Sequence, residues 1–273
     1  MQQLYNKFLY LKRTEPYLLT MFGMLFRKQN LILSPKYKNL KKLENIHYGK
    51  RLFIVCTGPS LTIDDLEKLK GEICFSMNSI VQIFNQTNWR PLYYMLNNSK
   101  DIIEHVEIAL SNSDLKNIFC MKYVQKRLSV QQNATFFNYP IINKAKEFKD
   151  SEHINPRNYR FSGDLYKGIS GGATTANAIF QIAVYMGFKK IYLLGCDLYA
   201  GHQLHFGPNI YSEKFPQETI DKVKRKILFG SQAAKEYTDA HGIKIYNATR
   251  GGDLEVFERV DLDEVLAKKE TSI

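Results

Sequence analysis

The segment Arg51–Leu61, RLFIVCTGPSL, constrains the fold of this chain more than any other. Its four apolar residues from Leu52 to Val55 predict a buried strand, and an amphipathic helix is predicted soon after, over Ile63–Leu69. A strand, a small-residue turn and a helix open many nucleotide-binding α/β sheets, because a helix N-terminus can receive phosphate. Gly58 would let the backbone approach a ligand, and Ser60 would cap the helix. The segment is neither a Walker A loop nor a G-x-G-x-x-G fingerprint, so a plain strand-to-helix turn remains the alternative.

Apolar runs alternate with helical patterns along the rest of the chain. Further strands are predicted at 72–77, 91–96, 116–121, 134–138, 190–195 and 243–246, and helices at 79–85, 101–110, 171–186 and 217–240. Residues 140–168 read as irregular, and 197–215 as a long loop. Repeated βα units predict an α/β, Rossmann-like, mostly parallel sheet with helices on both faces. We therefore expect one catalytic domain over 51–273, with residues 197–215 as a lid.

The positive charge of the chain lies mainly in its first segment. Residues 1–51 hold eleven Lys or Arg and two acids, which accounts for +9 of the net charge of +11. Within this segment, the apolar run Tyr17–Phe26 is flanked by Arg13 and by Arg27–Lys28. Ten residues are too few to span a bilayer, but they can lie in an interface whose anionic lipids attract the flanking cations. Residues 1–50 are predicted to form a basic helical arm that binds an anionic membrane surface or packs on the domain or on a second subunit.

The remaining composition excludes several classes. The content of 44% hydrophobic residues allows a sizeable core, and the four scattered cysteines predict buried free thiols in a reducing compartment rather than disulfides or a zinc site. No signal peptide is apparent, and the basic residues are not interleaved with stacking aromatics as in a nucleic-acid module. We expect a cytoplasmic protein, peripheral at the inner face of the plasma membrane if the arm binds lipid, with no nucleic-acid partner.

Polar residues follow several predicted strands at the point where each strand ends. In a parallel sheet these carboxyl ends share one edge, where ligands bind. Amide, hydroxyl and backbone groups there suit a nucleotide, although an Asn at a strand end can also simply turn the chain. The candidate binding residues at these strand ends are Thr57, Gly58, Pro59, Ser60, Asn78, Asn97, Asn247 and Arg250.

Two further segments carry candidate chemistry. Ser170, Gly171 and Gly172 open the helix predicted over 171–186, and this helix start could receive anionic oxygen or could serve close packing. Asp197 ends the clearest strand and could orient a hydroxyl, hold a metal or act as a base. Tyr199 could hydrogen-bond a phosphate. In the following loop, His202 and His205 suit a lid that supplies a general acid or base, and incidental surface histidines are the alternative.

Several motifs together resemble a known group. Residues 56–61, CTGPSL, resemble the GNGPSL opening of the family 42 bacterial sialyltransferases and of the wider MptE-like family (6-hydroxymethylpterin pyrophosphokinase MptE-like). Residues 187–199, GFKKIYLLGCDLY, resemble the sialyltransferase segment GYKEIYLSGIDFY, and Ser76–Asn78 resembles their second-strand Cys-Asn. The Gly171–Gly172 pair and residues 245–257, IYNATRGGDLEVF, are similar to the MptE-like family. The similarity covers about residues 50–266.

The resemblance implies a variant of the GT-A glycosyltransferase fold, a CMP-activated sugar donor and no metal. It places Gly58, Pro59, Ser60, Asn78 and Asn97 around the nucleotide and donor sugar. It also places Tyr199 on the phosphate and His202 or His205 on the lid as the base. The chain departs from the sialyltransferases at Thr57, which replaces the Asn that touches the donor. A second departure is Ser170–Gly172, which replaces Thr-Ser-Gly before a helix longer by about one turn.

The sequence thus predicts a sialyltransferase-like glycosyltransferase that uses a nucleotide-activated sugar, with inversion, in bacterial capsule or lipopolysaccharide synthesis. Its partners would be the donor, a glycan or lipid-linked glycan acceptor and, in a homo-oligomer, a second copy. Two alternatives stay open. One is Mg²⁺-dependent pyrophosphoryl transfer from ATP to a pterin-like alcohol, the only reading that needs a cofactor. The other is a non-catalytic nucleotide-binding scaffold.

Overall fold

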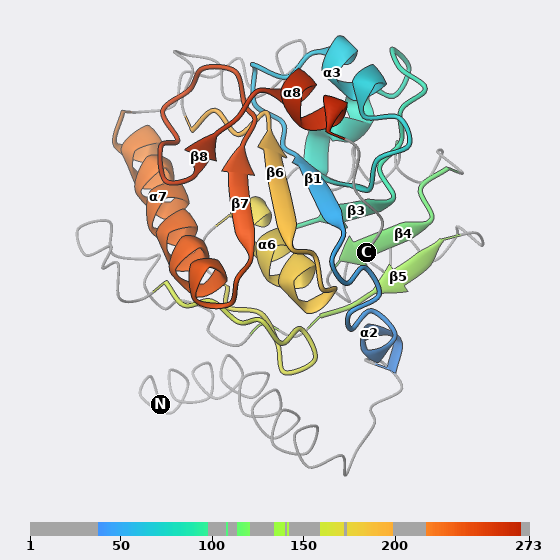
Figure 1. Ribbon diagram of the computed structural model, residues 1–273, viewed down its shortest axis with the longest axis vertical. Helices are drawn as coiled ribbons and strands as arrows, with labels where there is room; N and C mark the ends of the chain where they lie inside the picture. Colours follow the sequence, from blue (N-terminus) through green and yellow to red (C-terminus); the bar gives the residue numbers. More distant parts are fainter. Residues whose placement is uncertain are drawn as a thin grey trace, which may run out of the picture.

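The computed structural model of the chain is an α/β domain built on one sheet (Figure 1). The structure describes residues 38–97, 108, 114–120, 134–139, 141, 159–171, 174–198 and 217–268. Of the helix predicted over 101–110, Ile108 alone is described, and it is helical. Within these ranges, no helix combines the length and apolar character that crossing a membrane requires.

The sheet has eight strands in the order β5-β4-β3-β2-β1-β6-β7-β8, and every neighbouring pair is parallel. The chain therefore builds outward from β1 in one direction, then returns to place β6 on the other side of β1. The predicted Rossmann-like fold class is confirmed, and each predicted strand is present. The strands are β1 (Arg51–Val55), β2 (Cys74–Met77), β3 (Tyr93–Leu96), β4 (Asn117–Cys120), β5 (Thr135–Phe137), β6 (Lys190–Leu194), β7 (Lys244–Asn247) and β8 (Glu258–Arg259).

Helices cover both faces of the sheet, as predicted (Figure 1). The helices α6 (Thr175–Tyr185) and α7 (Gln217–Ala240) lie on one face, and α3 (Ile63–Lys68) and α8 (Leu262–Ala267) lie on the other. A 3₁₀ helix, η2 (Asn78–Ile83), stands where a short helix was predicted over 79–85. Strands buried on both sides explain the continuous apolar runs in the sequence.

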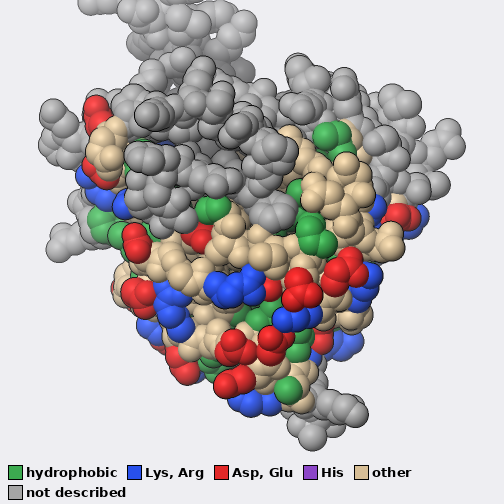
Figure 2. All heavy atoms as spheres, turned by 90° about the horizontal axis from the view of Figure 1, so that it is seen from above, with side chains coloured by type: hydrophobic (Ala, Val, Ile, Leu, Met, Phe, Trp, Pro, Cys, Tyr) green, Lys and Arg blue, Asp and Glu red, His purple; other side chains and the backbone are tan. Residues whose placement is uncertain are grey.

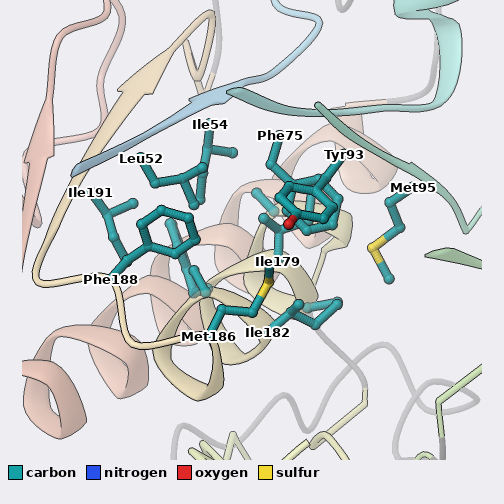
Figure 3. Packing of buried hydrophobic residues seen from close by; sticks show 14 of the residues in the cluster. Leu52, Ile54, Phe75, Tyr93, Met95, Ile179, Ile182, Met186, Phe188 and Ile191 are labelled. Carbon is teal, nitrogen blue, oxygen red and sulfur yellow. The ribbon is translucent and has the colours of Figure 1, made fainter. Parts of the chain in front are cut away.

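Side chains of each central strand alternate between the two cores. In β1, Leu52 and Ile54 face α6, whereas Phe53 and Val55 face α3. Figure 3 shows Leu52, Ile54 and Phe75 of the sheet above Ile179 and Ile182 of α6. All five side chains are 2% exposed or less, so the sheet and α6 form one tightly packed layer pair.

Helix α6 begins later than the predicted start at Gly171. Thr174 is the N-cap, and its hydroxyl accepts a hydrogen bond from the Asn177 backbone N–H (3.3 Å). Gly187 follows the helix with φ of +88°, the left-handed conformation expected of the residue that terminates a helix. The predicted stop at Gly187 is confirmed, while residues 170–171 lie before the helix and belong to no helix or strand.

Residues 38–50, placed in the basic arm by the sequence, pack closely against the end of α6. Leu40 and Leu43 are buried in the same core as α6. The backbone N–H groups of Asn45, His47 and Gly49 donate to the carbonyls of Tyr185, Met186 and Gly187 at 2.9 to 3.1 Å. This segment, which includes α2 (Lys38–Lys41), therefore satisfies the free carbonyls at the end of α6. An arm separate from the domain remains a prediction for residues 1–37, which lie outside the described residues.

Two elements near the C-terminus were not predicted. The two-residue strand β8 pairs with β7 at Tyr246–Glu258 and Asn247–Arg259. The short helix α8 follows, with Asp261 as its N-cap. Together they add a last βα unit. Of the four cysteines predicted to be buried, Cys56, Cys74 and Cys120 are buried and Cys196 is half-buried, and all four are free thiols.

Candidate functional site

The candidate site lies where the strand order reverses, at the carboxyl ends of β1 and β6. The chain continues from β1 to α3 and β2, and from β6 to α7 and β7, so the two connections lead to opposite faces and opposite sides of the β1–β6 pair. Ligands of doubly wound sheets bind at such a reversal. The adjacent ends of β3, β2, β1 and β6 carry Asn97, Asn78, the Thr57–Ser60 turn and Asp197, all predicted as site residues.

Asp197 and Ser60 join the two loops at the reversal. The Ser60 hydroxyl donates to Asp197 Oδ2 (2.9 Å), and the Ser60 backbone N–H approaches the same oxygen (3.4 Å). Gly58 makes this contact sterically feasible, since a Cβ at Gly58 would lie 2.0 Å from Asp197 Oδ2 and 2.5 Å from the Gly195 carbonyl. The predicted need for glycine at position 58 therefore has a structural cause, which is close approach to a carboxylate of the chain itself.

Burial shapes the electrostatics of Asp197. The residue is 5% exposed, and this desolvation raises the pKa of its carboxyl group above the ordinary value, while the hydrogen bonds from Ser60 partly offset the rise. A carboxyl group whose pKa is raised by burial, at a strand-order reversal, is a candidate functional position. Asp197 can orient a hydroxyl group or exchange a proton at this edge.

The start of α3 is occupied by the chain itself. Thr62, not Ser60 as predicted, is the N-cap, and it forms a capping box with Asp65. Arg250 then donates to Asp65 through both terminal nitrogens of its guanidinium, from Nη1 to Oδ1 (2.7 Å) and from Nη2 to Oδ2 (2.5 Å). Arg250 also donates to the Ser60 carbonyl (3.3 Å). The Asp65 carboxylate therefore occupies the start of α3. It also binds the guanidinium of Arg250, which was predicted from the sequence to be a ligand-binding group.

A second polar cluster links β2, β3 and α6. Asn78, in the left-handed conformation at φ of +45°, accepts a hydrogen bond from the Asn97 backbone N–H (3.2 Å). The Asn78 amide also donates to the Thr175 hydroxyl in the first turn of α6 (3.3 Å). The Tyr139 hydroxyl approaches the Asn97 side chain (3.5 Å). The two predicted asparagines are thus brought together and attached to the start of α6.

The start of α6 differs from the starts of the α-helices α3, α7 and α8. The first turns of α3, α7 and α8 carry acidic residues, whereas that of α6 carries none. Ser170, just upstream, is 6% exposed, and its hydroxyl has no hydrogen-bond partner among the residues that the structure describes. Gln181 fixes the Ser170 backbone by accepting from its N–H (2.7 Å) and donating to its carbonyl (3.1 Å). Seryl and threonyl hydroxyls at a helix start free of acids suit an anionic group.

Asn247 has a structural environment rather than an open one. It is 1% exposed, its amide donates to the Leu254 carbonyl (2.8 Å), and its side-chain oxygen accepts from the Thr249 N–H (3.0 Å). These bonds shape the loop that brings Gly252 against the Asp197 backbone, where the Asp253 N–H donates to the Asp197 carbonyl (3.0 Å). Asn247 therefore supports Asp197 from behind, and its predicted contact with a ligand has no geometric support.

Several predicted residues lie outside the described residues: Gly172, Tyr199, His202, His205 and the rest of the predicted lid up to residue 215. Their roles stay predictions. Within the described residues, no group of three or more His, Cys, Asp or Glu side chains is arranged to hold a metal ion.

The sequence interpretation missed three contributors to the site. The Tyr94 hydroxyl donates to the Asn78 carbonyl (2.5 Å) and holds it from the α3 face. Burial raises the pKa of Tyr94 well above its ordinary value, so this residue stays a hydrogen-bond donor. Thr175 and Tyr139 complete the cluster around Asn78 and Asn97. Thr175 lies in the helix predicted over 171–186. Tyr94 lies in an apolar strand and Tyr139 follows one, and neither carries a further local signal.

The fold and this edge define a Rossmann-like α/β domain with a fully parallel sheet. A family model described as 6-hydroxymethylpterin diphosphokinase MptE-like matches residues 27–202. The chain belongs to this MptE-like family, as its motifs predicted. The match includes residues 38–50, in agreement with their packing against α6.

Two solved structures are similar to this chain at low identity. One is the sialyltransferase CstII from Campylobacter jejuni in complex with a substrate analogue, which is 16% identical, with 78% of this chain and 85% of that chain covered and a TM-score of 0.47. The other is the monofunctional alpha-2,3-sialyltransferase Cst-I from the same organism, 17% identical, with 82% and 83% covered and a TM-score of 0.48. No curated protein matches the chain.

Proposed function

We propose that this protein is a glycosyltransferase that takes a nucleotide-activated sugar, with a CMP-linked sugar as the first donor to test. The observation that carries the proposal is the contrast between two helix starts at the site. Asp65 already fills the start of α3, whereas α6 begins with hydroxyls and no acid. Of the four α-helices α3, α6, α7 and α8, this leaves the start of α6 as the one without an acid and therefore suited to a phosphate. A donor whose leaving group bears a single phosphate fits that arrangement.

The proposed reaction uses the predicted residues in separate roles. Asn78, Asn97 and the Thr57–Ser60 turn would bind the nucleotide and donor sugar, and Asp197 would orient a hydroxyl of the donor. The start of α6 and Tyr199 would stabilise the phosphate as the bond from the sugar carbon to its oxygen breaks. A lid histidine, His202 or His205, would take the proton of the acceptor hydroxyl as that oxygen attacks the sugar carbon with inversion.

The description of the family favours a second candidate, a diphosphokinase that acts on a pterin alcohol. That reaction needs a Mg²⁺ ion with ATP, and such ions are usually held by one or two carboxylates together with the phosphates. Asp197 could supply one carboxylate. The two candidates differ in nucleotide, metal requirement and product, so one experiment can separate them.

The experiment measures thermal stability with CMP, CDP, UDP, GDP and ATP, each with Mg²⁺ or with EDTA. A ligand that binds the native state alone raises the melting temperature. Stabilisation by CMP or CDP in EDTA, followed by release of CMP from a CMP-linked sugar, supports the proposal. Stabilisation by Mg-ATP alone, with AMP as product, supports the diphosphokinase. No stabilisation by any nucleotide would contradict both enzymes.

Variants test the catalytic part of the proposal. His202→Ala or His205→Ala is expected to lower transfer by about 100-fold or more, since general base catalysis typically contributes that much. His241→Ala is the matched control, because His241 lies outside the site and its ring contacts the Tyr237 carbonyl (2.7 Å). Transfer unchanged in both lid variants would remove the histidine base from the mechanism.

We further propose that residues 1–37 attach the enzyme to anionic membranes, which would suit a lipid-linked acceptor in cell-surface polysaccharide synthesis. Because Leu40 and Leu43 belong to the core, a truncation must end before Lys38. The sharper test keeps the full chain and replaces Arg27 and Lys28 by Gln. Binding to phosphatidylserine vesicles should fall by about 30-fold, since each of the two cations near the surface contributes about 1 kcal/mol. Lys70→Gln serves as the control, and equal binding by all three proteins would contradict this part.

A further inference from the structure

Two thiols meet at the strand-order reversal. Cys56 directly follows β1, and Cys196 comes two residues after β6, the neighbouring parallel strand. The Cys56 backbone N–H donates to the Leu194 carbonyl (2.8 Å), which continues the ladder past the last paired residues. Gly195, with φ of +61°, then turns the chain so closely over β1 that a Cβ there would lie 3.0 Å from the Cys56 carbonyl. This turn brings Cys196 next to Cys56.

Both side chains lie on the same face of the sheet, the face covered by α6. Cys56 is buried in the α6 core, and Cys196 packs against that core while remaining half-buried. The Gly195 turn and the shared face of the sheet place the two side chains together. Hydrogen bonding with Cys196, together with burial, raises the pKa of the Cys56 thiol well above its usual range. Cys196 is therefore the thiol that a dissolved reagent reaches first, and Cys56 is the one held behind it.

We propose that Cys56 and Cys196 form a modification site at which a peroxide produces a reversible intramolecular disulfide. The Cys196 thiolate attacks hydrogen peroxide, so that an S–O bond forms, the O–O bond breaks and hydroxide leaves. Cys56 sulfur then attacks the Cys196 sulfur. The S–S bond forms, the S–O bond breaks, and the hydroxyl leaves as water with the Cys56 proton. Peroxide is reduced and the two thiols are oxidised, so the atoms and electrons balance.

Such a disulfide would link the loop after β1 to the loop after β6 beside the Ser60–Asp197 contact. The proposal requires only the two thiols and their placement, and it does not depend on which reaction the protein catalyses. Any change in nucleotide binding after oxidation would be a consequence to measure separately.

The test treats the purified full-length protein with hydrogen peroxide, removes the peroxide, and alkylates free thiols with N-ethylmaleimide under denaturing conditions. Peptide mass spectrometry is expected to find the Cys56 and Cys196 peptides joined and lighter by two hydrogen atoms. Dithiothreitol should restore both alkylated peptides. Cys74 and Cys120 are internal controls, since both are buried on the opposite face of the sheet, and they should stay alkylated throughout.

Variants exclude other pairings. Cys196→Ser should leave Cys56 fully alkylated after peroxide, whereas Cys74→Ser should form the cross-link as the wild type does. Three outcomes would overturn the proposal: four alkylated thiols after peroxide, Cys196 oxidised to a sulfinic acid with Cys56 still alkylated, or a cross-link between Cys196 residues of two chains. The wild-type protein alone decides among these outcomes, so the test does not depend on a variant folding.

Discussion

The starts of α3 and α6 lie at the same edge of the sheet but have opposite chemical surroundings. At α3, the Thr62 cap is joined by Asp64 and Asp65 in the first turn, and Arg250 closes the arrangement. At α6, the Thr174 cap is followed by Thr175 and no acid. The α3 start therefore stabilises the fold with a carboxylate of the chain, whereas the α6 start keeps its positive dipole end for another group.

This difference shows why a strand, a small-residue turn and a helix are weak evidence for a phosphate site. The turn after β1 has the composition expected of a phosphate loop, yet its glycine accommodates Asp197 and its helix start accommodates Asp65. On the face seen from above in Figure 2, acidic and basic side chains of the described residues are interspersed. The ion pairs of Lys68 with Asp64 and Asp263 belong to the α3 and α8 side of the molecule. An anion would meet less repulsion at α6.

The largest effect is expected for Gly58→Ala, in the turn that precedes α3. The new Cβ would overlap both Asp197 Oδ2 and the Gly195 carbonyl, so a strand end must shift. We expect a loss of about 3 kcal/mol in the free energy of unfolding, measured in urea. Gly71→Ala is the control, because its Cβ meets nothing within 4 Å and only its φ of +90° is unfavourable. Equal losses in the two variants would contradict the close packing of Gly58 on Asp197.

The next effect is expected for Asp65→Ala, which opens the start of α3. The variant loses the capping box and the two bonds from Arg250, which is 56% exposed, so we expect a loss of about 2 kcal/mol. Asp64→Ala, which removes an exposed partner of Lys68, should cost less than about 0.5 kcal/mol.

The Asp65 effect should depend on pH in a defined direction. Burial by itself raises the pKa of Asp65, but hydrogen bonds from Arg250 and Thr62 outweigh it, so the pKa lies below the ordinary value of 3.8. The stabilisation is therefore present above pH 3.8 and is lost as the pH falls through the lower pKa of the folded state. A difference between wild type and Asp65→Ala that grows on acidification would contradict this assignment.

The N-cap residues of α3 and α6 allow a direct comparison of the two helix starts, with a smaller expected effect on stability. Thr174→Ala and Thr62→Ala should each cost about 1 kcal/mol of stability, because each removes an N-cap. Thr174→Ala alone should also weaken nucleotide binding, by about fivefold, the value of one hydrogen bond. Calorimetric titration with the nucleotide that stabilises the wild type measures this. Equal weakening by both variants, or by Thr62→Ala alone, would reverse the roles assigned to the two helix starts.

The smallest effect on stability is expected for Asp197→Asn. Burial raises the pKa of Asp197 in the folded state above its ordinary value of 3.8. The contribution of Asp197 to the free energy of unfolding is therefore fully present below pH 3.8, and it is lost as the pH rises through the raised pKa. The Asp197→Asn variant should therefore melt at pH 7 at the same temperature as the wild type or slightly higher. The Asp65→Asn variant should melt at a lower temperature. Melting curves from pH 4 to 8 compare the two, and a destabilisation by Asp197→Asn that grows with pH would be inconsistent with a raised pKa.

The sequence predicts the fold well where apolar runs are long enough to be buried on both sides. The runs in β1 and β6 and the small-residue helix α6 carry strong signals. The strand β8 carries none, because it consists of Glu258 and Arg259 and pairs along one edge only. Helix α8 begins with Asp-Leu-Asp-Glu, a capping pattern, but six residues are too few for a helical period to be evident.

The candidate site is harder to predict because the partners of its side chains are distant in sequence. Arg250 is bound to Asp65, and Ser60 to Asp197, across more than 130 intervening residues in each case. No local pattern reveals that Arg250 is already engaged. Strand-end position alone grouped Asn78 and Asn97 correctly, because neighbouring parallel strands end at the same edge.

The two outermost strands of the sheet have a consequence for self-association in concentrated solution. An exposed edge strand offers unpaired backbone N–H and C=O groups to another molecule, and short or charged edge strands discourage such pairing. Here β5 has three residues and β8 has two. Arg259 of β8 also donates to the carbonyls of Thr249, Gly251 and Gly252 in its own chain. Among the described residues, the parallel eight-stranded sheet thus ends in two short edge strands, which offer little template for the growth of fibres.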